Sequence, residues 1–132
     1  MTTRAAGTFE VKITPLTPDG IGSDKSMGRM AIDKRFQGDL EGTSNGEMLT
    51  GGTDVKGSAA YVAVEKVEGK LAGRAGTFLL RHVGTMTRGV PQLSVVVVPD
   101  SGTGELKGLS GTMNILIEPG KHSYEFDYSL ET

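Results

Sequence analysis

A four-residue string, Asp100-Ser101-Gly102-Thr103, matches the signature of an aspartic peptidase, and the apolar run 95–98 precedes it. Such enzymes activate a water molecule between two facing aspartates that share one proton, so a second copy of this short chain would have to supply the other aspartate. Pro99 fixes the backbone and removes an amide donor just before the string. Asp, Ser and Gly between two apolar segments are typical of a tight turn. We therefore favour a turn over a peptidase site.

Glu65 and His82 are the candidates for general acid–base catalysis. Successive side chains of a strand point to opposite faces, and since Arg81 should be exposed, His82 should point inward. Both faces of the segment around Glu65 are largely apolar, so the pattern does not decide where Glu65 points. If it points inward, burial would raise its pKa toward the range useful for proton transfer. The alternative is a structural network in which Glu65 pairs with Lys34 or a tyrosine hydroxyl, and for any single residue we favour this alternative.

Other side chains on the expected inward faces could hold a small ligand. The predicted ligand-binding residues are Lys34, Tyr61, Phe78, Met113, Tyr124 and Tyr128. In this hypothesis Glu65 acts as acid or base, while His82 and the tyrosines orient the ligand. If the tyrosines and Met113 instead fill the interior, no cavity remains for a ligand.

The elements that must position these side chains are strands. Apolar and polar residues alternate most clearly in 7–13 and 122–130, which is the period of a strand with one buried face. Turn-forming residues between them mark further strands, at 27–36, 37–52, 58–67, 73–86, 93–98 and 106–117. About eight short strands without a convincing helix predict a sandwich or a barrel. A closed barrel removes exposed edges and, at eight strands, can hold one small ligand.

Composition narrows the classes of function. The chain has 132 residues, a formal net charge of -2 and no cysteine. Its basic residues are scattered, whereas nucleic-acid binding usually needs a basic patch, so no nucleic-acid partner is expected. Neither histidine belongs to a recognisable metal-ligand spacing, and we expect no metal or other cofactor. The longest apolar run is far too short to cross a bilayer, so we expect a cytoplasmic protein without a membrane partner.

Three segments carry a resemblance to a known family: GEMLTGG at 46–52, the segment 57–86, and the segment 93–130. Together they resemble a bacterial family of small proteins of unknown function. Structures in that family are similar to the allene oxide cyclase barrel, an eight-stranded antiparallel relative of the lipocalin-like, or calycin-like, barrels. The resemblance implies this fold, and implies that the string Ser-Gly-Thr-Gly at 101–104 connects two strands. Distant structural cousins include cyclases and dirigent proteins, but a shared fold does not fix function.

We therefore expect a single all-β domain, residues 1–132, folded as a closed or nearly closed antiparallel barrel of about eight strands. The leading hypothesis is that it binds a small apolar or amphipathic molecule in the lumen, with cofactor-free isomerase or cyclase chemistry as an extension. One alternative is a non-catalytic carrier or sensor, and another is a filled structural barrel that acts through its surface. We also expect a homo-oligomer. Whether the protein is an enzyme is left open by the sequence.

Overall fold

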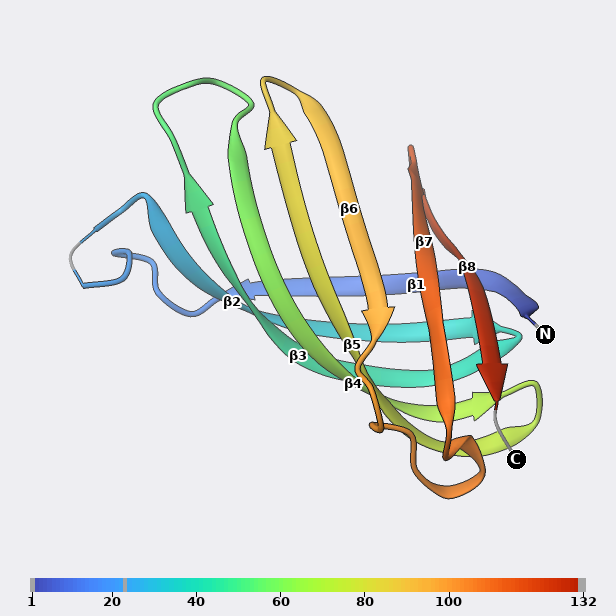
Figure 1. Ribbon diagram of the computed structural model, residues 1–132. Coiled ribbons are helices and arrows are strands. Elements are labelled where there is room, and N and C mark those ends of the chain that lie inside the picture. Colours follow the sequence, from blue (N-terminus) through green and yellow to red (C-terminus); the bar gives the residue numbers. More distant parts are fainter. Residues whose placement is uncertain (1, 23, 131–132) are drawn as a thin grey trace.

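The computed structural model describes residues 2–22 and 24–130, which form an eight-stranded antiparallel β-barrel (Figure 1). Its strands are β1 (Thr3–Pro15), β2 (Met27–Gly38), β3 (Leu40–Gly52), β4 (Ala59–Leu71), β5 (Arg74–Thr87), β6 (Val90–Val97), β7 (Leu109–Glu118) and β8 (Lys121–Leu130). Each strand pairs with the next one along the chain, and β1 also pairs with β8, which closes the barrel. The described residues contain no α-helix, only the short 3-10 turn η1 (Gly104–Leu106). The predicted fold class is confirmed.

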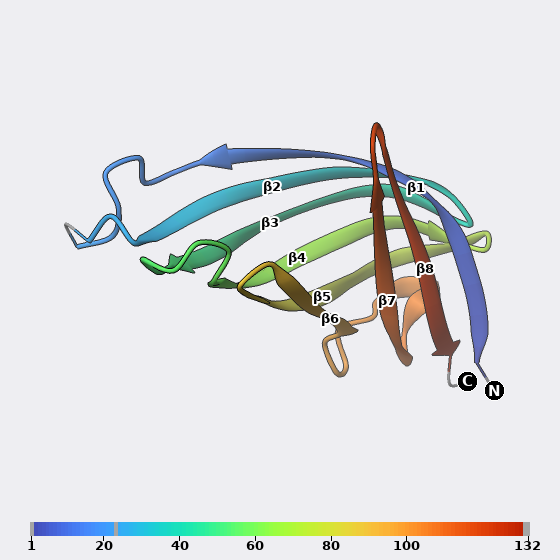
Figure 2. The same ribbon diagram turned by 90° about the horizontal axis from the view of Figure 1, so that it is seen from above.

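The strand β1 is shared between two neighbours. Its first part, from Thr3 to Thr8, pairs with β8, and its later part, from Gly7 to Pro15, pairs with β2. The views in Figures 1 and 2 show the β7–β8 hairpin running steeply across the direction of β2 and β3. The long, bent β1 therefore joins two parts of the sheet that run in different directions.

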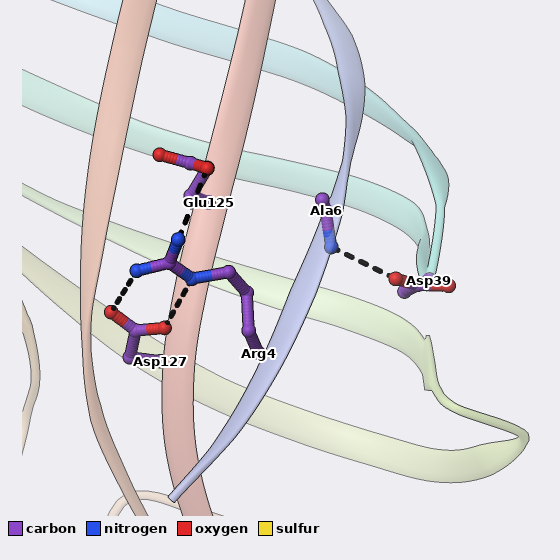
Figure 3. Close-up of polar contacts among 5 residues, drawn as sticks. All are labelled: Arg4, Ala6, Asp39, Glu125 and Asp127. Atoms are coloured by element: carbon purple, nitrogen blue, oxygen red, sulfur yellow. Dashed lines mark hydrogen bonds and ion pairs between the residues drawn. The ribbon is translucent and has the colours of Figure 1, made fainter.

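Side chains reinforce this closure on the outer surface, as Figure 3 shows. The guanidinium of Arg4 on β1 donates to Asp127 on β8 at 2.8 Å and to Glu125 at 3.3 Å. The carboxylate of Asp39, in the β2–β3 turn, accepts a hydrogen bond from the backbone amide of Ala6 at 2.9 Å. The first part of β1 is thus tied on one side to β8 and on the other to the β2–β3 turn.

The β2–β3 turn corrects one predicted boundary. The sequence pattern predicted one bent strand over 37–52, whereas β2 continues to Gly38 and β3 begins at Leu40. Gly38 has φ +110, a conformation that residues with a side chain rarely adopt, and it packs closely on the β1 backbone. Gly38 therefore belongs to a tight turn between two strands and not to a bend within one strand.

One end of the barrel is filled. Aromatic side chains pack there in pairs, with ring centroids 5.9 Å apart for Phe78 and Phe126 and 5.7 Å apart for Phe36 and Tyr124. Large aliphatic side chains complete this packed end, namely Leu40, Val67, Leu71, Leu80, Leu106 and Leu109. A core of this kind follows from the alternation of the strands, which turns every second side chain inward. It forms a rigid base for the rest of the lumen.

The seam between β6 and β7 is the weakest closure of the barrel. β6 pairs with β5 along its whole length, and β7 pairs with β8 along its whole length. Across the seam, however, the described residues form a single pair, Val96 with Thr112. From this point β6 and β7 diverge (Figure 1). The predicted short strand at 93–98 thus begins earlier, at Val90, but most of it has a strand partner on only one side.

Candidate functional site

The string Asp100-Ser101-Gly102-Thr103 lies in the connection between β6 and η1, as predicted for a turn. Three side chains of this connection accept hydrogen bonds from alternate backbone amides of β5, at 3.0, 3.0 and 3.1 Å: Ser101 from Leu79, Thr103 from Thr77, and Glu105 from Ala75. The pairing of β5 with β6 ends at Leu80. The three side chains therefore bind amides of β5 that β6 does not reach. Asp100 is exposed and has φ 62, a conformation that Asp tolerates in turns. The motif therefore secures the edge of a strand.

Four buried polar side chains meet inside the barrel: Lys34 from β2, Ser44 from β3, Glu65 from β4 and His82 from β5. We call them the polar cluster. Its centre is Glu65, which is fully buried and lies 3.0 Å from the ammonium nitrogen of Lys34 through Oε2. Its other oxygen, Oε1, lies 3.5 Å from Nε2 of His82. The inward orientation predicted for His82 is confirmed, and the structure turns Glu65 inward as well.

The electrostatics of Glu65 differ from the sequence-based expectation. Burial raises the pKa of Glu65, but the contact with His82 and the charge of Lys34 lower it more, so the pKa lies below its ordinary value. The predicted upward shift is wrong because a buried carboxyl group that accepts a contact from His82 and faces the cationic Lys34 keeps its charge. Glu65 is therefore a carboxylate at neutral pH and cannot serve there as a general acid. Its pairing with Lys34 is the structural network that the sequence analysis favoured.

The polar cluster retains unused hydrogen-bonding capacity. Ser44 Oγ is buried and has no hydrogen-bond partner within the part of the chain that the structure describes, and the buried His82 Nε2 has only the 3.5 Å contact with Glu65. A buried polar atom without a partner costs about 1–3 kcal/mol. A hydrogen-bonding group delivered to this place would recover part of that cost.

An apolar cleft of about 560 Å³ lies at the open end of the barrel, opposite the packed end. Its lining comes from β3, β4, β5, β6 and β7 and includes Thr50, Ala59, Tyr61, Met86, Leu93 and Ile117. No charged side chain among the described residues lines it. Several apolar lining residues are exposed to solvent, with 42% exposure for Met86, 44% for Leu93 and 71% for Ile117. The cleft is thus an open apolar surface inside an otherwise packed barrel.

Tyr61 connects the cleft to the polar cluster. Its ring covers Gly84, its partner across the strands, where a side chain would collide with the ring. Burial raises the pKa of Tyr61, and the charge of Glu65 raises it further. His82 lies two residues from Gly84 on the same face of β5, which is one layer deeper in the barrel. A molecule in the cleft would therefore rest on Tyr61, with His82 beneath it.

The predicted ligand-binding residues divide between these places. Tyr61 lines the cleft and Lys34 belongs to the polar cluster, whereas the others, Phe78, Met113, Tyr124 and Tyr128, are buried in the hydrophobic core. The Tyr124 hydroxyl accepts a hydrogen bond from the Leu40 amide at 2.9 Å, and lies 3.0 Å from the Leu40 carbonyl oxygen. The structure gives Tyr124 a role in anchoring the β2–β3 turn.

Sequence reasoning missed most of the cleft. Met86 shares a strand face with His82, so alternation placed it inward, but this pattern could not show that β5 extends beyond the packed interior. Leu93 and Ile117 come together only because β6 and β7 flank the same seam. Ile117 lies at the end of its strand, where alternation carries little information. The inward-facing positions of these strands continue beyond the polar cluster, and this continuation is the sequence feature that could have indicated the cleft.

A second apolar surface lies outside the barrel. Leu49, Val62 and Val83 are neighbours across β3, β4 and β5, and they are 48%, 48% and 39% exposed. Val64, two residues along β4, is 50% exposed, and we call these four residues the outer patch. Both faces of β4 are apolar because one faces the lumen and the other forms this patch.

Residues 2–22 and 24–130 contain neither a candidate metal-binding group nor a membrane-spanning helix. No group of three or more His, Asp or Glu side chains there is arranged to hold a metal ion. No helix of the described chain has the length and apolar character needed to cross a membrane.

Comparison with known proteins identifies the family. The family model of DUF3224, described as a protein of unknown function, matches residues 5–128. A DUF3224 protein of unknown function from Shewanella oneidensis MR-1, with a crystal structure at 1.84 Å resolution, is 51% identical over 100% of both chains, with a TM-score of 0.89. The comparison with curated proteins gave no match. The likeness to the allene oxide cyclase barrel stays a prediction, but the chain itself belongs to the DUF3224 family.

Proposed function

We propose that this protein binds a small apolar or amphipathic molecule in the cleft at the open end of its barrel. The observation that carries the proposal is the cleft itself, about 560 Å³ in volume and lined by uncharged side chains of the described chain. Sites for small molecules are typically concave, mostly apolar and about 300–1,000 Å³ in volume, with a few polar groups that fix orientation. Tyr61, which lines the cleft, supplies such a group, and His82 lies on the same face of the sheet one layer deeper.

The affinity would come mainly from apolar surface. Met86, Leu93 and Ile117 are each more than 40% exposed, although all three belong to strands that have buried residues elsewhere. Covering apolar surface contributes about 25 cal/mol per Å². A polar group on the ligand could hydrogen-bond to the Tyr61 hydroxyl. This combination favours an apolar or amphipathic molecule over a charged one.

The packed end limits where the ligand can lie. Phe78, Tyr124 and Phe126 occupy the other half of the lumen at close to zero exposure. Replacing this packing with a ligand would require the core to open, and packed interiors do not rearrange at low cost. The proposed site is therefore confined to the cleft, and the packed half serves as its support.

A second candidate is isomerase or cyclase chemistry on the bound molecule. The observation that favours it is the contact between Glu65 and His82 at 3.5 Å, directly below the cleft. In such chemistry His82 would exchange a proton with the ligand while the Glu65 carboxylate orients the imidazole ring. A carrier differs from an enzyme in one measurable way, because His82→Gln would leave the affinity of a carrier nearly unchanged while it would abolish turnover by an enzyme.

The binding proposal is tested by fluorescence titration with the neutral apolar probe N-phenyl-1-naphthylamine. We expect the wild-type protein to bind the probe, and Leu93→Lys to weaken binding by about tenfold or more, since a charge replaces an apolar wall. Val90→Lys is the matched control, because Val90 is 63% exposed on the same strand but does not line the cleft. Absence of binding, or equal loss in both variants, would refute the proposal.

A further inference from the structure

The cleft is not enclosed on all sides. Its lining includes Pro91, Gln92 and Leu93 from β6 and also Ile117 from β7. These two strands flank the seam, where the described residues form a single pair, Val96 with Thr112. The cleft therefore reaches the seam from both of its sides, and its wall there consists of side chains without a ladder of hydrogen bonds.

The register shows how the seam differs from an ordinary strand pair. Continuation of the antiparallel pairing from Val96 and Thr112 would place Leu93 opposite Ile115 and Pro91 opposite Ile117. Neither pair forms. Pro91 also lacks a backbone amide donor, which is typical of a strand edge. The unpaired part of the seam begins next to the polar cluster layer and widens toward the rim of the cleft.

The two edges of the seam carry exposed apolar side chains. Leu93 is 44% exposed on β6, and Ile117 is 71% exposed on β7. A contiguous exposed apolar patch, unlike a single exposed apolar residue, marks a surface used for binding. The apolar lining of the cleft thus reaches both edges of the seam.

We propose that the cleft takes an unbranched aliphatic chain, which lies in the seam between β6 and β7 and passes through it to the outside. The inference rests on the proposed binding function and adds the shape of the ligand. An enclosed cavity selects compact molecules, whereas a slot that is open along one side does not limit the length of its occupant. The uncharged lining of the cleft matches methylene groups. The polar end of the ligand is free to remain in water.

The test compares linear and compact alcohols as competitors of N-phenyl-1-naphthylamine. The linear series is 1-octanol, 1-decanol and 1-dodecanol, and the compact competitor is 1-adamantanol. We expect affinity to rise along the linear series by about two- to fourfold per methylene group, as burial of each group predicts. We expect 1-adamantanol to bind more weakly than 1-decanol, which has the same number of carbon atoms.

Substitutions in the seam test the position of the chain. Ile117→Lys places a charge in the slot, and Leu116→Lys is the matched control, because Leu116 is its 44%-exposed neighbour and does not line the cleft. We expect Ile117→Lys to weaken 1-dodecanol by about tenfold or more and to weaken 1-adamantanol much less. Leu116→Lys should change neither affinity. Circular dichroism and thermal unfolding of both variants verify that they are folded.

The outcomes separate this inference from the proposed function. Probe binding combined with equal affinity for 1-adamantanol and 1-decanol would refute the linear chain while the binding function stands. Equal weakening of both alcohols by Ile117→Lys would refute passage through the seam. If the wild-type protein binds neither the probe nor any alcohol, the proposed function itself is wrong, and the inference falls with it.

Discussion

Among single residues, the pair of Lys34 and Glu65 has the largest consequences for stability. Their side chains are 6% and 0% exposed, and the charged atoms lie 3.0 Å apart. Removing one partner of a buried ion pair leaves an uncompensated charge, whereas replacing both with apolar residues is often neutral or stabilising. Variants of this pair therefore test whether Glu65 stabilises the fold or only contacts a ligand.

We expect Glu65→Leu to destabilise the protein by about 3–5 kcal/mol, because it leaves the Lys34 ammonium group buried without its partner. The double variant Lys34→Met/Glu65→Leu should recover most of this loss. Urea unfolding of the three proteins gives the free energies. A single variant as stable as the wild type would show that Lys34 reaches water or another partner, and would contradict the network.

The same pair predicts a dependence on pH. Burial raises the pKa of Glu65, but the His82 contact and the Lys34 charge together hold it below its ordinary value, which is about 4.3. A lowered folded-state pKa contributes stability that is complete above the unfolded-state pKa and is lost as the pH falls through the folded-state pKa. We therefore expect the wild type to lose stability relative to Lys34→Met/Glu65→Leu as the pH falls below about 4. Thermal unfolding across the acid range measures this, and a constant difference would contradict it.

At the scale of elements, the connection after β6 shows how side chains can take the place of a strand. Thr103 accepts a hydrogen bond from the Thr77 amide at 3.0 Å, and its hydroxyl lies 2.6 Å from the Thr77 hydroxyl. Ser101 accepts a hydrogen bond from the Leu79 amide, and Glu105 accepts one from the Ala75 amide, on either side of Thr77 along β5. The end of β5 therefore depends on the side chains of a loop.

We expect Thr103→Val to cost about 1 kcal/mol, because the Thr77 amide loses its acceptor at nearly constant side-chain volume. Asp100→Asn is the control, since Asp100 is exposed and Asn also tolerates its positive φ. It should leave both stability and probe binding unchanged. Chemical unfolding measures both variants. A large effect of Asp100→Asn would mean that this carboxylate has a role that the strand connection does not explain.

The elements also show what the sequence could predict. Alternation at 7–13 and 122–130 together with the turn-forming residues between them indicated about eight strands, because a barrel wall with one buried face imposes a period of two. It did not place the turn at Gly38, since a tight turn and a bent strand both use glycine. It also left the direction of Glu65 open, because Val62 and Val64 make the outer face of β4 as apolar as the inner one. The partners that lower the Glu65 pKa come from β2 and β5, and long-range contacts of this kind leave no local pattern.

At the scale of the whole molecule, the barrel combines a packed half with an open half. The packed half accounts for four of the six predicted ligand-binding residues, Phe78, Met113, Tyr124 and Tyr128. The open half holds Tyr61 together with Met86, Leu93 and Ile117, which alternation could not assign to a cavity. The sequence predicts which side chains point inward, but whether an inward side chain packs or lines a cleft depends on how far each strand extends.

The homo-oligomer expected from the sequence stays a prediction, and the outer patch is the surface on which to test it. We expect the wild type to self-associate in sedimentation velocity and Val62→Lys to shift it toward monomers, because the substitution places a charge between Leu49 and Val83. Asn114→Lys, on the exposed face of β7, is the control and should change nothing. A monomeric wild type would contradict the expectation.

A ligand that occupies the cleft should leave the packed half of the barrel unchanged. The most direct measurement is a titration of the isotope-labelled protein with 1-dodecanol, followed through the amide signals in NMR spectra. We predict saturable shifts at Tyr61, Gly84 and Leu93, together with small changes at Phe78 and Phe126. Shifts confined to the outer patch or the packed half, or unchanged spectra at saturating alcohol, would contradict the account.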